Sequence, residues 1–271
     1  MYSVEELQQI ATNVRRGILE QVYTAKSGHP GGALSCADIL TAIYFNLANI
    51  DPNEPEKEDR DRIILSKGHA SAALYSVLAH RGFFDVEELR TFRKLHSGLQ
   101  GHPSLGKLPG IDMTTGSLGQ GLSVANGMAL AEKLDKKGYY TYVILGDGEI
   151  EEGQIWEAAM SASHYKLNKL IVFVDHNGLQ IDGKVTEVNS PTPIKEKFDA
   201  FGFNTIEIDG HDFEQIQNAV EKAKESTDKP TAIIARTVKG KGVSFMENQV
   251  GWHGKAPNEE QYNSALNELN K

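Results

Sequence analysis

Short apolar segments alternate with segments of helical spacing through the second half of the chain, and this alternation restricts the possible folds more than any other feature. Residues 140–145 and 170–174 are largely apolar, and residues 153–164 between them have helical spacing. The same alternation predicts a further strand, helix and strand over residues 204–208, 212–225 and 231–235. Strands that are apolar on both faces are typical of parallel sheets covered by helices on each side. The sequence therefore predicts an α/β fold, a parallel sheet flanked by helices on both faces.

The first half of the chain is less regular but is compatible with the same sheet. Helices are predicted over residues 7–25 and 37–47 and after Pro257. Residues 51–62 are charged and contain two prolines, which is typical of a solvated loop. An apolar strand over residues 63–65 follows at once, so we interpret this loop as part of the domain and not as a linker. We expect one domain over residues 1–271.

Composition and charge exclude several classes of protein. Cys36 is the only cysteine, so a disulfide-stabilised scaffold is excluded, and a chain of 271 residues can bury a core without one. The 37 acidic and 28 basic side chains give a net charge of −9, which disfavours nucleic acid as a partner. No apolar run approaches the roughly 18 residues of a membrane span, and the N-terminus does not resemble a signal peptide. We therefore expect a cytoplasmic protein without a membrane partner.

Polar residues follow two predicted strands that flank a single helix. Asp147 lies between Gly146 and Gly148 after the first strand, and Asn177 follows the second. Ligands of parallel α/β sheets bind at the carboxyl ends of strands, and these side chains carry oxygens that Mg²⁺ or Ca²⁺ prefers. Glycines beside Asp147 would let a diphosphate approach the backbone. Each loop alone could be an ordinary turn, but the pair favours a metal and diphosphate site.

Two other glycine-rich segments do not fit known phosphate-binding motifs. Residues 178–184 match the first part of a P-loop, but Val185 stands where the motif requires Ser or Thr, and no helical pattern follows. Residues 116–121 precede a helix, yet their glycines do not have the dinucleotide-binding order and no apolar strand precedes them. The P-loop interpretation is rejected, and a dinucleotide-binding fold is only weakly supported.

We single out four histidines whose glycine or proline neighbours place them on turns, where a ring can face a cleft. They are His29, His69, His102 and His253. Histidine suits proton transfer near neutral pH and hydrogen bonding to sugar hydroxyls. None of them has the spacing of a zinc site. The sequence alone does not show that they converge.

Several charged residues near the strand ends and near the C-terminus need no catalytic role to explain them. Four glutamates follow Gly148 around the start of the helix predicted over 153–164, where they interact favourably with its dipole: Glu149, Glu151, Glu152 and Glu157. Three basic residues lie after the last predicted strand and could contact phosphate, but the sequence favours solvated surface groups: Arg236, Lys239 and Lys241.

Taken together, these motifs resemble the thiamine-diphosphate motif and, more specifically, the N-terminal half of transketolases. Seven segments carry the resemblance in order along the chain: residues 27–31, 66–69, 96–103, 114–121, 146–153, 175–183 and 253–254. Ser117 departs from the family pattern, which has proline there.

The resemblance implies a thiamine-diphosphate-binding fold and a role for each matching residue. Asp147, Asn177 and the Leu179 carbonyl would ligate a divalent ion, Mg²⁺ or alternatively Ca²⁺ or Mn²⁺, with Gly146 and Gly148 against the diphosphate. Gly116 and Leu118 would lie against the aminopyrimidine ring of thiamine diphosphate. His29, His69, His102 and His253 would bind the ketose and assist proton transfer. Glu152, and with it Glu157, would connect the two cofactor sites of a dimer.

The resemblance also implies a partner. The family transfers a two-carbon ketol unit between sugar phosphates, and a second domain supplies the remaining cofactor and phosphate contacts. We therefore expect an N-terminal subunit that works with a separate C-terminal transketolase subunit, as an α2β2 assembly. The sugar phosphates used stay open. Two alternatives remain: a subunit of another thiamine-diphosphate enzyme such as a 2-oxoacid dehydrogenase, and a non-catalytic binding paralogue.

Overall fold

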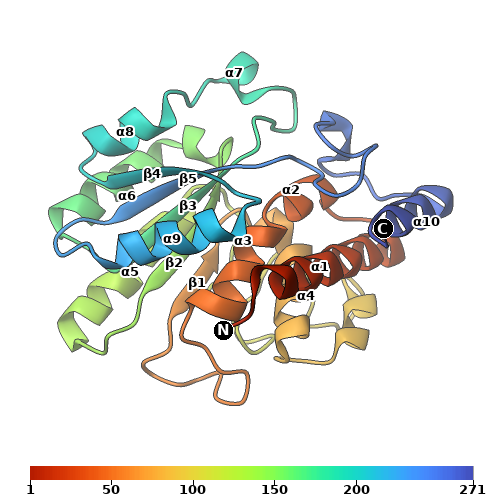
Figure 1. The fold of residues 1–271 in the computed structure, drawn as a ribbon, viewed down its shortest axis with the longest axis horizontal. Helices are drawn as coiled ribbons and strands as arrows, with labels where there is room; N and C mark the ends of the chain where they lie inside the picture. The colour runs from red at the N-terminus through yellow and green to blue at the C-terminus, as the bar shows by residue number, and fades with distance from the viewer. Residues whose placement is uncertain (271) are drawn as a thin grey trace.

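The computed structural model describes residues 1–270 and contains a five-stranded sheet with helices on both faces (Figure 1). All strand pairs are parallel, and the strand order is β1-β2-β3-β5-β4. The strands are β1 Arg62–Leu65, β2 Thr141–Gly146, β3 Leu170–His176, β4 Asn204–Asp209 and β5 Thr231–Arg236. The predicted α/β fold with a parallel sheet is confirmed.

Helices connect the strands and cover the sheet. The α-helices are α1 Val4–Ala25, α2 Pro30–Ser35, α3 Ala37–Ala42, α4 Ser71–Arg81, α5 Gln120–Asp135, α6 Gly153–His164, α7 Val185–Val188, α8 Ile194–Ala200, α9 Phe213–Lys224 and α10 Glu259–Glu268. A π-helical turn, η1 Ile43–Leu47, continues α3, and short 3-10 turns are η2 Gly68–Ala70, η3 Val86–Thr91, η4 Glu149–Glu151 and η5 Val250–Trp252.

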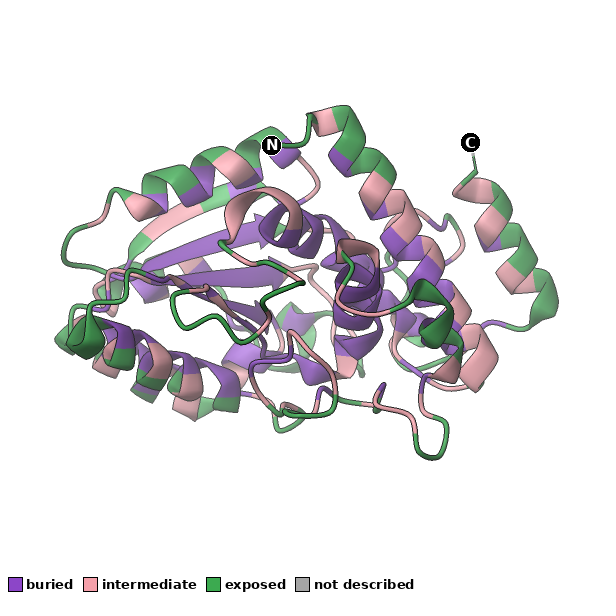
Figure 2. Cartoon of the chain, turned by 90° about the horizontal axis from the view of Figure 1, so that it is seen from below, coloured by how far each residue is buried: buried purple, intermediate pink, exposed green. Residues whose placement is uncertain are grey.

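Side chains of successive strand residues point to opposite faces and form two hydrophobic cores. In β2, Tyr142 and Ile144 pack with α1, α3, α4 and α9, whereas Val143 and Leu145 pack with α5, α6 and α8. The central strands are buried on both faces, and exposed residues gather on the outer surfaces of the helices (Figure 2). This burial on both faces explains why the strands are apolar almost throughout.

Most predicted elements are present, with boundaries that differ by a few residues. The first helix begins earlier than expected because Ser3 and Glu6 form a capping box at its N-terminus. Helices α4 and α8 were not predicted. Helix α4 is buried from Ser71 to Ala79, so it lacks the polar face that periodicity needs. The prediction that no helix follows Lys184 was wrong in detail, because α7 forms a single turn there.

The carboxyl ends of β1, β2 and β3 meet at one edge of the sheet. Here α5 approaches β1 closely, since a Cβ atom added at Gly121 would lie 2.2 Å from Ser66 Oγ and 2.4 Å from Ser66 Cβ. Gly119, just before α5, has φ +84°, a left-handed conformation that glycine adopts without strain. These glycines allow residues 116–121 to pack against the strand ends.

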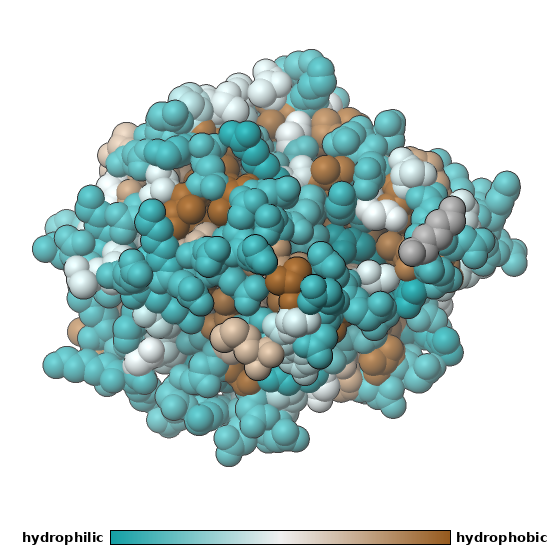
Figure 3. Space-filling model, viewed as in Figure 1, coloured by the Kyte–Doolittle hydropathy of each residue, from teal (hydrophilic) through white to brown (hydrophobic). Residues whose placement is uncertain are grey.

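The surface is largely polar. The face shown in Figure 3 is predominantly hydrophilic, with scattered small hydrophobic areas. Among residues 1–270, no helix combines the length and apolar character that crossing a membrane requires.

We expect two glycine substitutions in α5 to act in opposite directions. Gly121→Ala forces the helix away from Ser66 and should destabilise the chain by about 1–3 kcal/mol. Gly127→Ala is the matched control, because an added Cβ there would meet no atom of the described residues within 4 Å. It should stabilise the chain by up to about 1 kcal/mol through helix propensity. Urea unfolding of both variants measures this, and equal effects would contradict the close approach.

Candidate active site

A cavity of about 250 Å³ lies at the carboxyl ends of β1, β2 and β3. It brings together most of the residues that the motifs singled out, from segments more than 200 residues apart in the sequence. The lining consists of His29, Gly32, Lys67, His69, Gly116, Leu118, Gly146, Asp147, Gly148, Glu149, Asn177, Leu179, Gln180, Ile181, Lys239 and His253.

Three of the four predicted histidines form a compact cluster in this cavity. The ring centroids of His29, His69 and His253 are 5.1–5.4 Å apart in every pair. Burial, aided by Arg93, lowers the pKa of His29 to about 4, and burial, aided by Lys239, lowers the pKa of His253 to about 3. Burial and the charge of Lys67 also hold the pKa of His69 well below its usual value. All three rings are therefore neutral at pH 7 and can both donate and accept hydrogen bonds.

His102 lies beside this cluster and does not line the cavity. Its ring Cγ would be 3.3 Å from a Cβ atom added at Gly116, so the two residues are in close contact. Burial, with Arg93, lowers the pKa of His102. Glu152 does not line the cavity either; it is exposed next to α6, and Glu157 is exposed on that helix.

Asp147 is a buried carboxylate that forms no ion pair among residues 1–270. Its oxygens accept hydrogen bonds from the backbone N–H groups of Gly148, at 2.9 Å, and Gly178, at 2.5 Å. Burial, and then repulsion from Asp175, raises its pKa to about 7. A nearby cation would relieve both effects and favour the ionised carboxylate.

Oxygen donors gather around Asp147, which fits a divalent cation. Asn177 and Leu179 line the same cavity, and Leu179 contributes a backbone carbonyl oxygen. The Asn177 amide oxygen accepts a hydrogen bond from the Leu179 N–H at 3.1 Å, which holds this side chain against the loop that carries Leu179. Hard cations such as Mg²⁺ prefer carboxylate, amide and carbonyl oxygens. The residues present therefore fit a metal-bound diphosphate.

A buried ion pair between Lys67 and Asp175 lies beneath the cavity, and the motifs assign neither residue a role. The side chains are 2% and 0% exposed. Asp175 also accepts from Ser35 Oγ, at 2.5 Å, and from the Thr237 hydroxyl. The Lys67 ammonium additionally donates to the Gly32 carbonyl at 2.6 Å. Burial alone would raise the pKa of Asp175, but Lys67 outweighs it and holds the pKa below its usual value.

Glu149 also has a different environment from the one expected. It was interpreted as one of several acids near a helix start, but it is buried. Its carboxylate accepts from the Ser66 hydroxyl, from the Gly119 N–H at 2.9 Å and from the Gly146 N–H at 3.0 Å. It thereby joins the 116–119 loop to the ends of β1 and β2, which positions Gly116 and Leu118 at the cavity.

The prediction that Lys239 is a solvated surface residue was wrong. It is 1% exposed, and its Nζ donates to the Leu179 carbonyl at 3.1 Å and to His253 Nδ1 at 3.0 Å. Burial lowers its pKa to about 8. Sequence reasoning missed it because no strand or helix pattern surrounds residue 239. Lys67 and Asp175 did carry a signal, since each is a charged residue directly at the end of an apolar strand.

The comparisons with known proteins agree with this geometry. The family model described as transketolase, thiamine diphosphate binding domain, matches residues 7–269. A 6-deoxy-6-sulfo-D-fructose transketolase subunit of Clostridium sp. strain MSTE9 is 46% identical, with 98% of this chain and 97% of the relative covered. An apulose-4-phosphate transketolase subunit of Phocaeicola vulgatus is 43% identical, with 99% and 95% covered.

A solved structure extends the comparison to a longer transketolase. The chain superimposes on the transketolase of Campylobacter jejuni with a TM-score of 0.93 and 37% identity, over 99% of this chain. It spans 43% of that transketolase. The matches favour the transketolase interpretation over a 2-oxoacid dehydrogenase subunit. The chain therefore belongs to the transketolase family and comprises its thiamine diphosphate binding domain.

Proposed function

We propose that residues 1–271 form one domain and act as the N-terminal subunit of a two-subunit transketolase. The subunit transfers a two-carbon ketol unit from a ketose phosphate to an aldose phosphate together with a separate C-terminal subunit, in an α2β2 assembly. One observation carries this proposal: the chain matches subunit-length relatives almost from end to end while its cavity combines the diphosphate, metal and histidine groups.

Within this chain, one end of the cavity holds the cofactor. Asp147, Asn177 and the Leu179 carbonyl hold Mg²⁺, and Gly146 and Gly148 leave room for the diphosphate beside the backbone. Gly116 and Leu118, which line the cavity, would contact the aminopyrimidine ring. When bound, thiamine diphosphate supplies the carbon nucleophile and the electron sink that ketol transfer needs.

Lys239 adds a positive charge at the same end of the cavity. Its Nζ lies against the Leu179 carbonyl, next to the proposed metal ligands. A buried ammonium there attracts a diphosphate and compensates for the acidic surface of the chain.

Glu152 and Glu157 are exposed on η4–α6 and remain available to a second copy of the chain.

The histidine cluster binds and orients the sugar substrate. Because His29, His69 and His253 are neutral, each ring can donate to the ketose carbonyl or accept from a hydroxyl without first losing a proton. His102 lies beside them at the Gly116 side. The donor sugar is oriented by these rings, which also carry protons to and from its hydroxyl oxygens.

The first test is reconstitution. We expect the chain alone to show no ketol transfer above background, because the partner supplies part of the active site. Adding a C-terminal transketolase subunit should restore transfer over a panel of ketose and aldose phosphates. Sedimentation should then give the mass of an α2β2 complex. Full activity of the isolated chain would refute the two-subunit proposal.

The second test removes the proposed metal ligand. Asp147→Asn keeps the shape of the side chain but removes its charge. In the assembled complex it should raise the Kd of thiamine diphosphate in the presence of Mg²⁺ by about 100-fold. Asp228→Asn, an exposed carboxylate far from the cavity, is the control and should leave the Kd unchanged. Calorimetric titration measures both, and an unaltered Kd for Asp147→Asn would exclude it from the metal site.

The third test concerns the neutral histidines. The pKa of His29 is about 4 when folded and 6.5 when unfolded, so the unfolded state binds more protons between these values. The contribution of His29 to the free energy of unfolding should therefore be fully present above pH 6.5 and should be lost as the pH falls toward 4.

His29→Gln should reduce that slope, measured by urea unfolding at pH 7, 6 and 5. His96→Gln, at an exposed loop position, is the control and should keep the wild-type slope. Comparing slopes removes any constant packing loss. An unchanged slope for His29→Gln would mean that the pKa of His29 is the same in the folded and the unfolded chain, which contradicts the lowered pKa.

A further inference from the structure

The position of Lys239 in the cavity depends on the turn that carries it. Residues 237–241 follow β5 and place the Lys239 side chain at the lining of the cavity, where it contacts the Leu179 carbonyl and His253. The Thr237 hydroxyl binds Asp175 at the start of the turn, and the Gly240 N–H donates to the Gly31 carbonyl at 3.0 Å. These contacts hold the side of the turn that faces the cavity.

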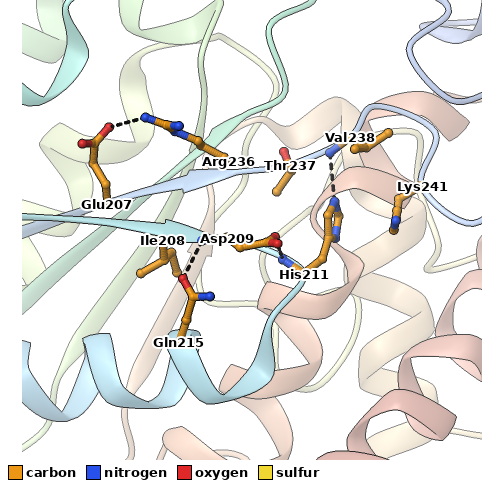
Figure 4. A pocket seen from close by; sticks show the side chains of 9 residues that line it. All are labelled: Glu207, Ile208, Asp209, His211, Gln215, Arg236, Thr237, Val238 and Lys241. Carbon is orange, nitrogen blue, oxygen red and sulfur yellow. Dashed lines mark hydrogen bonds and ion pairs between the residues drawn. The ribbon is translucent and has the colours of Figure 1, made fainter.

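A second set of contacts holds the opposite side of the same turn. His211, between β4 and α9, accepts a hydrogen bond from the Val238 N–H at its Nε2 atom, at 2.9 Å (Figure 4). Because Nε2 accepts, the ring proton is on Nδ1, which lies 2.7 Å from Asp38 Oδ2 and donates to it. His211 thus connects the turn to a buried carboxylate.

Asp38 is itself fixed by Arg15. The guanidinium binds both carboxylate oxygens, at 2.9 and 2.6 Å, and its Nε donates to the Lys241 carbonyl at 3.2 Å. Arg15 is 7% exposed and Asp38 is 4% exposed, so this pair is shielded from solvent. The two charged residues lie on α1 and α3, which belong to the core. One buried network therefore holds both ends of the turn, at Val238 and at Lys241.

We propose that His211 is a positioning residue: with Asp38 and Arg15 it fixes the 237–241 turn so that the Lys239 ammonium reaches the diphosphate of the cofactor. This inference rests on the proposed function, because it takes the diphosphate as the ligand of Lys239. His211 does not line the cavity and acts only through the backbone of the turn.

A double-mutant cycle in the reconstituted complex tests the proposal, with the Kd of thiamine diphosphate in excess Mg²⁺ as the readout. Losing the hydrogen bond from Val238 should raise this Kd about tenfold in His211→Ala. Lys239→Ala should raise it at least as much. If His211 acts through Lys239, the double variant should equal Lys239→Ala alone.

Two amide variants separate the two hydrogen bonds of His211: the one that Nε2 accepts from the Val238 N–H and the one that Nδ1 donates to Asp38. The amide of His211→Asn can reach Asp38 in place of Nδ1 but leaves Val238 without an acceptor, so its Kd should match His211→Ala. The longer His211→Gln can place its oxygen near the position of Nε2 and should return the Kd to within about threefold of wild type. These variants keep a polar group at the site, so they keep the test decisive if His211→Ala does not fold.

Glu207→Gln provides the matched control. Glu207 and His211 line one surface hollow, which is separate from the active-site cavity, and Glu207 pairs at 3.2 Å with Arg236, which is largely exposed (Figure 4). The two side chains of this exposed pair make no hydrogen bond to residues 237–241, and the variant should leave the Kd and the melting temperature unchanged.

The outcomes distinguish this inference from the proposed function. Additive effects of His211→Ala and Lys239→Ala, or a folded His211→Asn variant with wild-type Kd, would overturn the positioning role. An unchanged Kd for Lys239→Ala would instead refute the assignment of Lys239 to the diphosphate. Absence of cofactor binding by the wild-type complex would refute the proposed function itself.

Discussion

The ion pair between Lys67 and Asp175 is the interaction on which the geometry of the site depends. Both groups are removed from water, and such a pair is tolerated only where hydrogen bonds satisfy its remaining donors and acceptors. Ser35, Thr237 and the Gly32 carbonyl provide them. The pair therefore joins the ends of β1, β3 and β5 to α2. The candidate site residues lie next to these anchor points, so one buried contact sets their mutual positions.

The same pair explains why two aspartates at neighbouring strand ends differ. Asp175 has a permanent cation, which keeps its pKa low despite burial. Asp147, on the adjacent strand end, is buried beside that negative charge without an ion-pair partner among residues 1–270, and its pKa is raised to about 7. The Asp175 carboxylate thus has a structural role in the ion pair with Lys67, whereas the Asp147 carboxylate is available to bind a ligand. A divalent cation with a diphosphate is a ligand that Asp147 would favour.

The sequence predicted the sheet and the Asp147 loop because both depend on local patterns, whereas Gly116, Leu118 and Leu179 were named only from the resemblance to transketolases. Burial of β2 and β3 on both faces makes them apolar, and the glycines around Asp147 mark a close backbone approach. Helix α4 escaped prediction because it is buried all round, which leaves no polar face to read. Lys239 and His211 could not be identified either, since their environments are created by contacts with residues 60 and 173 positions away in the sequence.

Two buried charge networks meet at the turn that carries Lys239, one centred on Asp175 and the other on Asp38. This arrangement lets the lysines serve two purposes at once. Lys67 neutralises Asp175, and Lys239 adds a positive charge that suits the proposed diphosphate. Beyond the effect of burial, their charges also lower the pKa values of His69 and His253 respectively, so the rings beside them stay neutral. The two buried lysines thereby also keep neutral the histidine rings that we propose to bind the sugar.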